Sequence, residues 1–168
     1  MHTLHLLRHA KSSWADEGLP DHDRPLAPRG VKNAKRMAEH LRTVEMAPDL
    51  VLCSTALRTR QTLELVAPAL ADAPIELADD LYGASLEALL ERLRRLPDSV
   101  GTVLVIAHNP GLEDLALHLA APGPIRDELA VKFPTGALAS LEIGQGSWAD
   151  LRPGGAKLVS FTAPRSLQ

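Results

Sequence analysis

Three short apolar runs along the chain each end abruptly in charged or polar residues. They cover residues 3–8, 50–53 and 102–107. Continuous apolar runs of this length, bounded by turn signals and followed by helical patterns, are typical of buried parallel strands. Open α/β sheets bind ligands beyond the carboxyl ends of their strands. We therefore expect the residues at these ends, Arg8, His9, Arg58 and His108, to converge on one pocket.

Helical periodicity fills the segments between the runs. Apolar residues spaced to form one helix face begin at Pro28 and end before Pro48, and a second such segment extends from about Ala56 to Pro68. Further helices are predicted over residues 86–96, capped by Ser85, and from residue 111 to about Ala121, where the sequence Pro122-Gly123-Pro124 breaks the pattern.

The remaining apolar segments are weaker and differ in character. Residues 75–77 form a weak third strand, and residues 137–143 and 156–162 look like two strands separated by a Gly-rich turn region. Strands alternating with helices indicate an α/β protein. We expect a three-layer α/β/α sandwich with a mostly parallel sheet, formed by residues 1–168 as a single domain.

Composition narrows the class of protein. The net charge of −3 offers no overall basic field for nucleic acid, and no apolar run approaches the length of a membrane span. The first residues lack the pattern of a signal peptide, and the single cysteine, Cys53, lies in a predicted buried strand, where it is most simply a small core residue. We therefore expect a cytoplasmic protein that binds neither nucleic acid nor membrane.

A long polar loop follows the first strand. It covers residues 10–27 and contains Gly18, Pro20 and an Asp-His-Asp-Arg-Pro run. Loops of this length are uncommon in compact domains and are often functional. We expect this loop to border the pocket, with Lys11, Ser12 and Arg24 as candidate substrate-binding residues, although each could equally be a solvated loop residue.

Two arginines and two histidines at strand ends suit a tetrahedral oxyanion. The planar guanidinium matches phosphate oxygens bidentately and keeps its charge at any working pH. Arg58 would lie in the first turn of a helix, where the helix dipole disfavours a cation, and a bound anion would relieve that conflict. Phosphate is therefore the expected ligand.

A neutral imidazole at such a site is a competent nucleophile toward phosphorus. We expect His9 to be this nucleophile and His108 to neutralise charge on the phosphoryl oxygens. A single Arg-His pair after a strand occurs often by chance, and it is the matching chemistry at three strand ends that favours catalysis. The other histidines share no spacing, and no carboxylate or thiol completes a zinc ligand set, so neither a metal nor a cofactor is expected.

The three motifs resemble those of the histidine phosphatase superfamily, also called the phosphoglycerate-mutase-like family. They are the Leu7-Arg8-His9-Ala10 segment, the stretch over residues 54–62, and the His108-Asn109-Pro110-Gly111 segment. The short chain and the Asp23-Arg24-Pro25-Leu26 segment are most similar to the bacterial phosphohistidine phosphatase branch, the SixA type. This resemblance implies a phosphohistidine intermediate on His9, with Arg8, Arg58 and His108 binding the phosphoryl group and Asn109 beside it.

The sequence departs from the family pattern where a general acid is expected. Mutase-like members carry a Glu where this chain has Tyr82, and acid-phosphatase members carry an Asp where it has Asn109. An alkoxide leaving group gains roughly 100- to 10,000-fold from such an acid, whereas imidazole is far less basic. The absence therefore favours a P–N bond in the substrate, unless another carboxylate supplies the proton: Asp79, Asp80, Glu113 or Asp114.

The sequence thus predicts a metal-free phosphatase that acts on a phosphohistidine-bearing protein. A small-molecule phosphomonoesterase of low selectivity is the alternative enzyme. A phosphate- or phosphoprotein-binding module without turnover is a third possibility, and the intact Arg8, His9, Arg58 and His108 argue against it.

Overall fold

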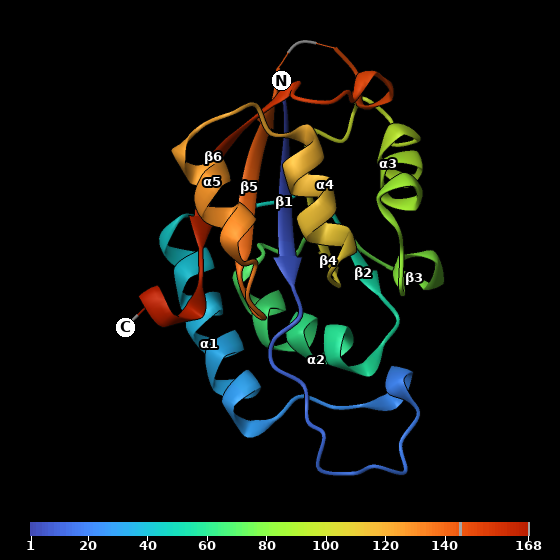
Figure 1. Cartoon of the computed structure of the whole chain (residues 1–168), viewed down its shortest axis with the longest axis vertical. Helices are drawn as coiled ribbons and strands as arrows, with labels where there is room; N and C mark the ends of the chain where they lie inside the picture. Colours follow the sequence, from blue (N-terminus) through green and yellow to red (C-terminus); the bar gives the residue numbers. More distant parts are fainter. Residues whose placement is uncertain (145, 168) are drawn as a thin grey trace.

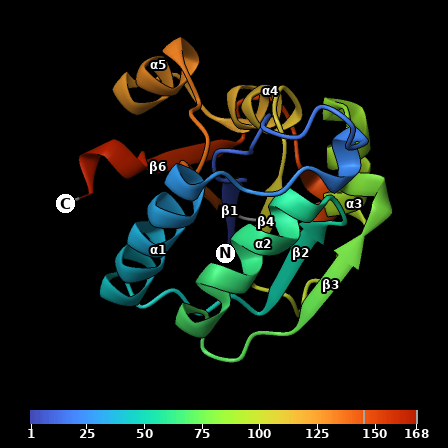
Figure 2. The same cartoon turned by 90° about the horizontal axis from the view of Figure 1, so that it is seen from below.

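A six-stranded sheet lies between two layers of helices in the computed structural model, which describes residues 1–144 and 146–167 (Figures 1 and 2). The strands are β1 (His2–Arg8), β2 (Leu50–Ser54), β3 (Ile75–Ala78), β4 (Thr102–Ala107), β5 (Leu138–Ile143) and β6 (Ala156–Thr162). The helices are α1 (Pro28–Thr43), α2 (Leu57–Val66), α3 (Leu86–Arg94), α4 (Gly111–Leu119) and α5 (Pro124–Val131), with short 3-10 turns that include η1 (Asp21–Asp23), η3 (Asp79–Leu81) and η5 (Pro164–Ser166).

The sheet is mostly parallel, with strand order β3-β2-β4-β1-β5-β6. Strands β1 to β4 run parallel to one another, and β5 and β6 extend the sheet in antiparallel fashion. The expected three-layer α/β/α fold with a mostly parallel sheet is confirmed. Because β4 lies between β1 and β2, the carboxyl ends of these three strands are neighbours at one edge.

Alternation along the strands divides the core into two layers. In β4, Val103 and Val105 pack with α3, α4 and α5, whereas Leu104 and Ile106 pack with α1 and α2 on the opposite face. Figure 2, seen along the strands, shows α1 and α2 on one side of the sheet and α3, α4 and α5 on the other. The side chains that end a strand therefore lie between two packed helical layers, which hold them in place.

Helix α5 is not among the elements predicted from the sequence. Pro122-Gly123-Pro124 was expected only to break a helix, but Pro124 begins a new one, at a position where the missing N–H costs nothing. Cys53 is fully buried and burial raises the pKa of its thiol to about 12, as expected for a core residue. No helix of the described residues is long and apolar enough to cross a bilayer.

Candidate active site

The carboxyl edge of the sheet gathers the four residues that the sequence predicts to act together. Arg8 ends β1, His9 follows it, Arg58 lies in the first turn of α2, and His108 follows β4. The ring centroids of His9 and His108 are 5.2 Å apart, and both rings are buried. The Arg8 and Arg58 guanidiniums are close enough to lower the pKa of His9.

His9 is held in one tautomer. Its Nδ1 lies 2.7 Å from the Ala10 carbonyl oxygen, which can only accept, so Nδ1 carries the proton and Nε2 the lone pair. Nε2 forms no hydrogen bond with any described residue. Burial, followed by the charges of Arg58, Arg8 and Arg24, lowers the pKa of His9 to about 4. The ring is therefore neutral at pH 7 and presents a free nitrogen.

His108 is also neutral and lies on the opposite side of the cluster. Its Nε2 is 2.8 Å from Ser54 Oγ, and its buried Nδ1 has no partner among the described residues. Burial, then the nearby His9 and Arg58, lower the pKa of His108 to about 3. A phosphoryl dianion in the pocket would oppose these effects, because it favours a protonated, donating imidazole.

Arg8 is oriented by a segment far along the chain. Its Nη1 donates to the Phe133 carbonyl at 2.9 Å, and the Gly136 N–H donates to the carbonyls of Arg8 and His9 at 3.1 and 2.9 Å. The Arg8 Nε is buried without a partner among the described residues. Nothing in the sequence marked residues 133–136 as part of the site.

Arg58 binds an internal anion that the sequence analysis missed. Its Nη2 donates to Asp21 Oδ2 at 3.0 Å and its Nη1 to the Asp21 carbonyl at 2.8 Å. Tyr82 donates its hydroxyl to the same Asp21 oxygen at 2.6 Å. The Tyr82 hydrogen bond, together with Arg58 and Arg24, holds the pKa of Asp21 well below its usual range. Arg58 lies at the start of a helix, where a cation needs a nearby anion, and the Asp21 carboxylate of the loop is that anion.

The loop over residues 10–27 is braced by Arg24, which is almost fully buried. Its guanidinium donates to Asp21 Oδ1 at 3.1 Å and to Ser12 Oγ at 2.9 Å, and lies 3.5 Å from the centre of the Trp14 ring. Arg24 and Ser12 are therefore engaged with the loop itself. Lys11 is exposed and lines an open pocket of about 470 Å³ together with Arg8.

Asn109 is engaged with the backbone at the start of α4. Its Nδ2 donates to the Phe133 carbonyl at 3.1 Å, and its Oδ1 accepts from the Glu113 N–H at 3.2 Å. Asn109 therefore helps to fix the turn that carries His108. Its predicted contact with substrate stays a prediction.

Tyr82 stands at the position where the family resemblance places a general acid, and its ring faces His108. The two rings pack edge to face with centroids 5.6 Å apart. The hydrogen bond to Asp21 raises the pKa of Tyr82, so its hydroxyl stays protonated, while the Asp21 carboxylate stays ionised. The Asp21 carboxylate, although hydrogen-bonded to Tyr82 and Arg58, is therefore not a proton donor at neutral pH.

The four carboxylates that the sequence analysis kept as possible acids lie around this cluster. Asp79 accepts from Thr55 Oγ1 at 2.6 Å, and Asp80 lies 3.9 Å from the Arg92 guanidinium. Burial lowers the pKa of Arg8 and the charge of Glu113 opposes this shift, while Asp114 lines a pocket of about 410 Å³ that also includes His108.

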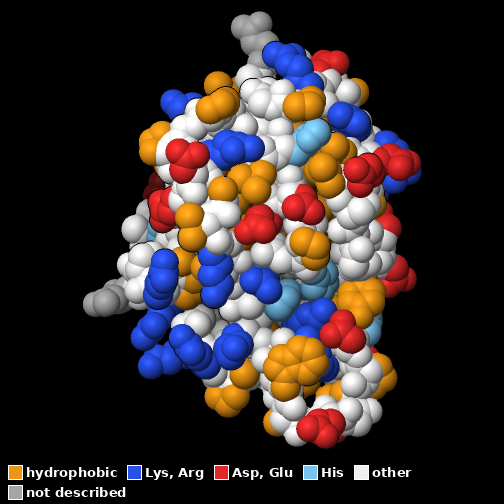
Figure 3. Space-filling view, in the orientation of Figure 1, with side chains coloured by type: hydrophobic (Ala, Val, Ile, Leu, Met, Phe, Trp, Pro, Cys, Tyr) orange, Lys and Arg blue, Asp and Glu red, His pale blue; other side chains and the backbone are white. Residues whose placement is uncertain are grey.

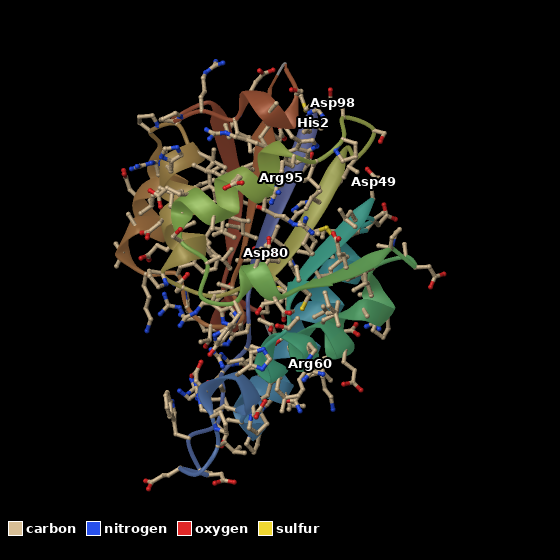
Figure 4. The ribbon with its side chains drawn as sticks, turned by 90° about the vertical axis from the view of Figure 1, so that its right-hand side faces the viewer. His2, Asp49, Arg60, Asp80, Arg95 and Asp98 are labelled. Carbon is tan, nitrogen blue, oxygen red and sulfur yellow. The ribbon has the colours of Figure 1, made fainter. Side chains whose placement is uncertain are left out.

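Among the other histidines, His22 lies beside the site, where its ring packs against Tyr82 with centroids 4.8 Å apart and its Nε2 is 3.0 Å from Thr55 Oγ1, whereas His2 and His5 lie apart from it. His5 is hydrogen-bonded to Ser140 at 2.7 Å, and burial lowers its pKa to about 4. Figure 4 shows His2 beside Asp98 at the far end of the molecule from Arg60, which lies in α2 near the site. Among the described residues, no group of three or more histidine, cysteine or carboxylate side chains could hold a metal ion.

The three-layer α/β fold and the cluster of two arginines and two histidines at the carboxyl edge of its sheet define the class of protein to compare with known families. A family model gives the class its name: the chain belongs to the histidine phosphatase superfamily, branch 1, whose model matches residues 4–89. The protein is therefore a phosphatase of the histidine phosphatase type, as the resemblance of its motifs implied.

Relatives cover nearly the whole chain. The uncharacterized protein Rv1276c of Mycobacterium tuberculosis is 45% identical over 163 residues, which are 95% of this chain and 100% of the relative. A solved structure from Nakamurella multipartitia, assigned as a phosphohistidine phosphatase SixA, is 36% identical with a TM-score of 0.85, covering 97% of this chain and 96% of that one. A protein histidine phosphatase SixA complexed with tungstate is 26% identical with a TM-score of 0.80, and 99% of each chain is covered.

Proposed function

We propose that this protein removes the phosphoryl group from a phosphohistidine of another protein, through a covalent phosphohistidine on His9. The observation that carries this proposal is the state of His9. Its ring is neutral, its Nδ1 is fixed by the Ala10 carbonyl, and its Nε2 is free and flanked by two guanidiniums. A fixed, neutral imidazole beside an anion-binding pair is the arrangement that nucleophilic attack on phosphorus requires.

The reaction proceeds in two displacements. His9 Nε2 attacks phosphorus while the P–N bond to the substrate imidazole breaks, and the departing nitrogen keeps the bonding electrons and takes up a proton from solvent. Water then attacks the phosphorus on His9, which releases inorganic phosphate and a proton and restores the free imidazole. Arg8, Arg58 and His108 bind the phosphoryl oxygens in both steps and stabilise their charge.

Substrate binding at Arg58 exchanges one anion for another. The Asp21 carboxylate is paired with this guanidinium at 3.0 Å. Phosphoryl oxygens offer the same bidentate geometry with a greater charge, so they displace the carboxylate from Arg58.

Leaving-group chemistry supports phosphohistidine over an alkyl phosphate. Asp21 is ionised and cannot protonate a leaving group, and the Tyr82 proton is committed to Asp21. An imidazole departs without a positioned acid, whereas an alkoxide does so poorly. The similarity to SixA proteins, one of them complexed with the tetrahedral oxyanion tungstate, supports the same substrate class.

A series of substrates with graded leaving-group pKa values tests the proposal. We expect the wild-type protein to hydrolyse a phosphohistidine peptide and activated aryl phosphates, and to turn over a phosphoserine peptide and sugar phosphates at least 100-fold more slowly. A flat dependence would contradict this mechanism and indicate a small-molecule phosphomonoesterase with an unrecognised acid.

Tyr82→Glu completes the experiment. A carboxylic acid at this position should improve alkyl phosphate hydrolysis and flatten the dependence on leaving-group pKa, because the Tyr82 ring lies beside His108. Tyr82→Phe is the matched control: it removes the hydroxyl bonded to Asp21 but introduces no acid. If both variants give the same dependence, position 82 does not control protonation of the leaving group.

A further inference from the structure

Seven cationic side chains line two adjoining open pockets beside the active site. The pockets measure about 470 and 520 Å³ and share Arg29, Asn33 and Arg165. We define these cations as the basic patch: Arg8, Lys11, Arg29, Lys32, Arg36, Lys132 and Arg165. Figure 3 shows Lys and Arg side chains gathered over the lower left of the molecule, where Figure 1 places α1 and the C-terminal segment.

Within the described part of the chain the basic patch is poorly neutralised: Glu113 acts on Arg8 through its charge, and the other six cations form no salt bridge with a carboxylate. Neither pocket is lined by an aspartate or glutamate, and none of the salt bridges between described residues includes a member of the patch. The first turn of α1 contains no acidic residue either. Like charges held this close repel one another unless an external anion neutralises them.

The rest of the molecule has the opposite sign. The chain has 18 Lys and Arg against 21 Asp and Glu, so the seven patch cations leave eleven for the remainder and a balance of −10 there. The charge of this protein is therefore segregated, and its small net charge hides a localised basic surface.

The fold brings the patch together next to the chemistry. Its members are Arg8 at the end of β1, Lys11 in the loop that follows, three side chains of α1, Lys132 just after α5, and Arg165 in η5. Arg8 belongs to both the patch and the predicted phosphoryl site. An anion bound by the patch therefore lies within reach of a group bound at His9.

The shape and chemistry of the patch point to an acidic protein surface. Arg29, Lys32 and Arg36 are exposed and follow one face of α1 over about 10 Å, which is too long for one small ligand. No aromatic ring lines either pocket, so there is no platform on which nucleic-acid bases could stack. The negative remainder of the surface repels a long polyanion but accommodates a compact acidic face.

We propose that the basic patch binds aspartate and glutamate residues that flank the phosphorylated histidine of the protein substrate. This inference rests on the proposed function and assigns the chemistry of its partner. The patch selects the protein around the phosphohistidine, while the cluster at His9 binds only the phosphoryl group.

Two phosphohistidine peptides and two triple variants test the inference. The peptides differ only in acidic or neutral residues flanking the phosphohistidine. Arg29→Ala/Lys32→Ala/Arg36→Ala removes the α1 part of the patch, and Lys35→Ala/Arg95→Ala/Lys157→Ala removes the same charge from exposed positions outside both pockets. Thermal melting and turnover of an aryl phosphate verify that both variants keep the fold and the basal activity.

We expect wild-type kcat/KM to be about tenfold higher on the acidic peptide than on the neutral one, with the preference shrinking between 50 and 500 mM salt. The patch variant should lose this preference and the control variant should keep it. Equal kcat/KM on both peptides would overturn the inference alone, and so would inhibition by tripolyphosphate without peptide preference, which indicates a small polyanion. Failure of the wild-type protein to hydrolyse either peptide would refute the proposed function, and the inference with it.

Discussion

At the scale of single residues, the environment of His9 converts an ordinary imidazole into a candidate nucleophile. A histidine in water is partly protonated near neutral pH and exchanges between two tautomers. Here one carbonyl fixes the tautomer, and burial with three arginines removes the proton. The sequence could predict that a strand would end on His9, but the tautomer depends on where the Ala10 carbonyl points.

Replacing the nucleophile is the direct test of this assignment. His9→Ala should lower turnover by roughly 10³-fold or more and should abolish trapping of an acid-labile phosphoenzyme, because the other imidazole of the cluster, His108, has its Nε2 in a hydrogen bond with Ser54 Oγ. The far-ultraviolet circular dichroism should stay unchanged. Activity near that of the wild-type protein would exclude the covalent mechanism.

A physical reason explains why Asp21 was not predicted as a site residue. The motif residues were found because arginine and histidine at strand ends are unusual, whereas Asp21 sits in a polar loop where an aspartate attracts no notice. Its role depends on a hydrogen bond with Arg58, which lies 37 positions further along the chain. Arg24 was expected to contact substrate because it lies in the loop that follows the first strand. In the structure its guanidinium donates to Asp21 and Ser12 of the same loop.

At the scale of elements, periodicity was informative wherever an element packs on the sheet. The predicted parallel strands and the four helices between and after them are present, because each buries one apolar face and leaves that pattern in the sequence. Helix α5 buries only Leu129 fully, so its pattern was too weak to find. The elements that position the site were thus predictable, and the helix that packs against α4 and β6 was not.

The loop over residues 10–27 should control phosphate affinity through Asp21. Asp21→Asn removes the charge that competes for Arg58, so inorganic phosphate should inhibit several-fold more strongly. Asp23→Asn is the matched control, since Asp23 is exposed and faces His22 rather than Arg58. The inhibition constant for phosphate is the measurement. Weaker inhibition in Asp21→Asn would mean that Asp21 supports the bound state instead.

Close packing of α1 on this loop predicts a second effect. A Cβ at Gly30 would lie 2.1 Å from the Lys11 carbonyl oxygen, which accepts a hydrogen bond from the Ala27 N–H. Gly30→Ala should therefore destabilise the protein by about 1–3 kcal/mol and lower kcat/KM by shifting the backbone that follows His9. Gly144→Ala, where no atom lies within 4 Å of the added Cβ, is the control. Equal melting temperatures in both variants would contradict this prediction.

At the scale of the whole molecule, the buried neutral histidines make stability depend on pH. The pKa values of His5 and His9 fall to about 4 and that of His108 to about 3, from 6.5 in the unfolded chain. The unfolded state therefore takes up protons first, so the free energy of unfolding decreases as the pH falls from about 6.5 to 4. Each such histidine contributes at most about 1.4 kcal/mol per pH unit.

Urea unfolding at a series of pH values measures this dependence. Stability should be constant above about pH 7.5 and should decline steadily toward pH 4. Added inorganic phosphate should reduce the decline, because the bound anion favours protonation of His108 in the folded state. A stability maximum near pH 5 would show that these imidazoles are not buried in neutral form.

The Phe133 carbonyl limits which parts of this enzyme can be removed without disturbing the site. It accepts from both Arg8 and Asn109, which belong to the first and last of the three sequence motifs. A chain shortened to residue 132 would keep every motif residue and the whole stretch matched by the family model, yet the Arg8 guanidinium would have lost its anchor. Transferring the motifs to another scaffold would therefore copy the reactive groups without the Phe133 carbonyl that orients Arg8 and Asn109.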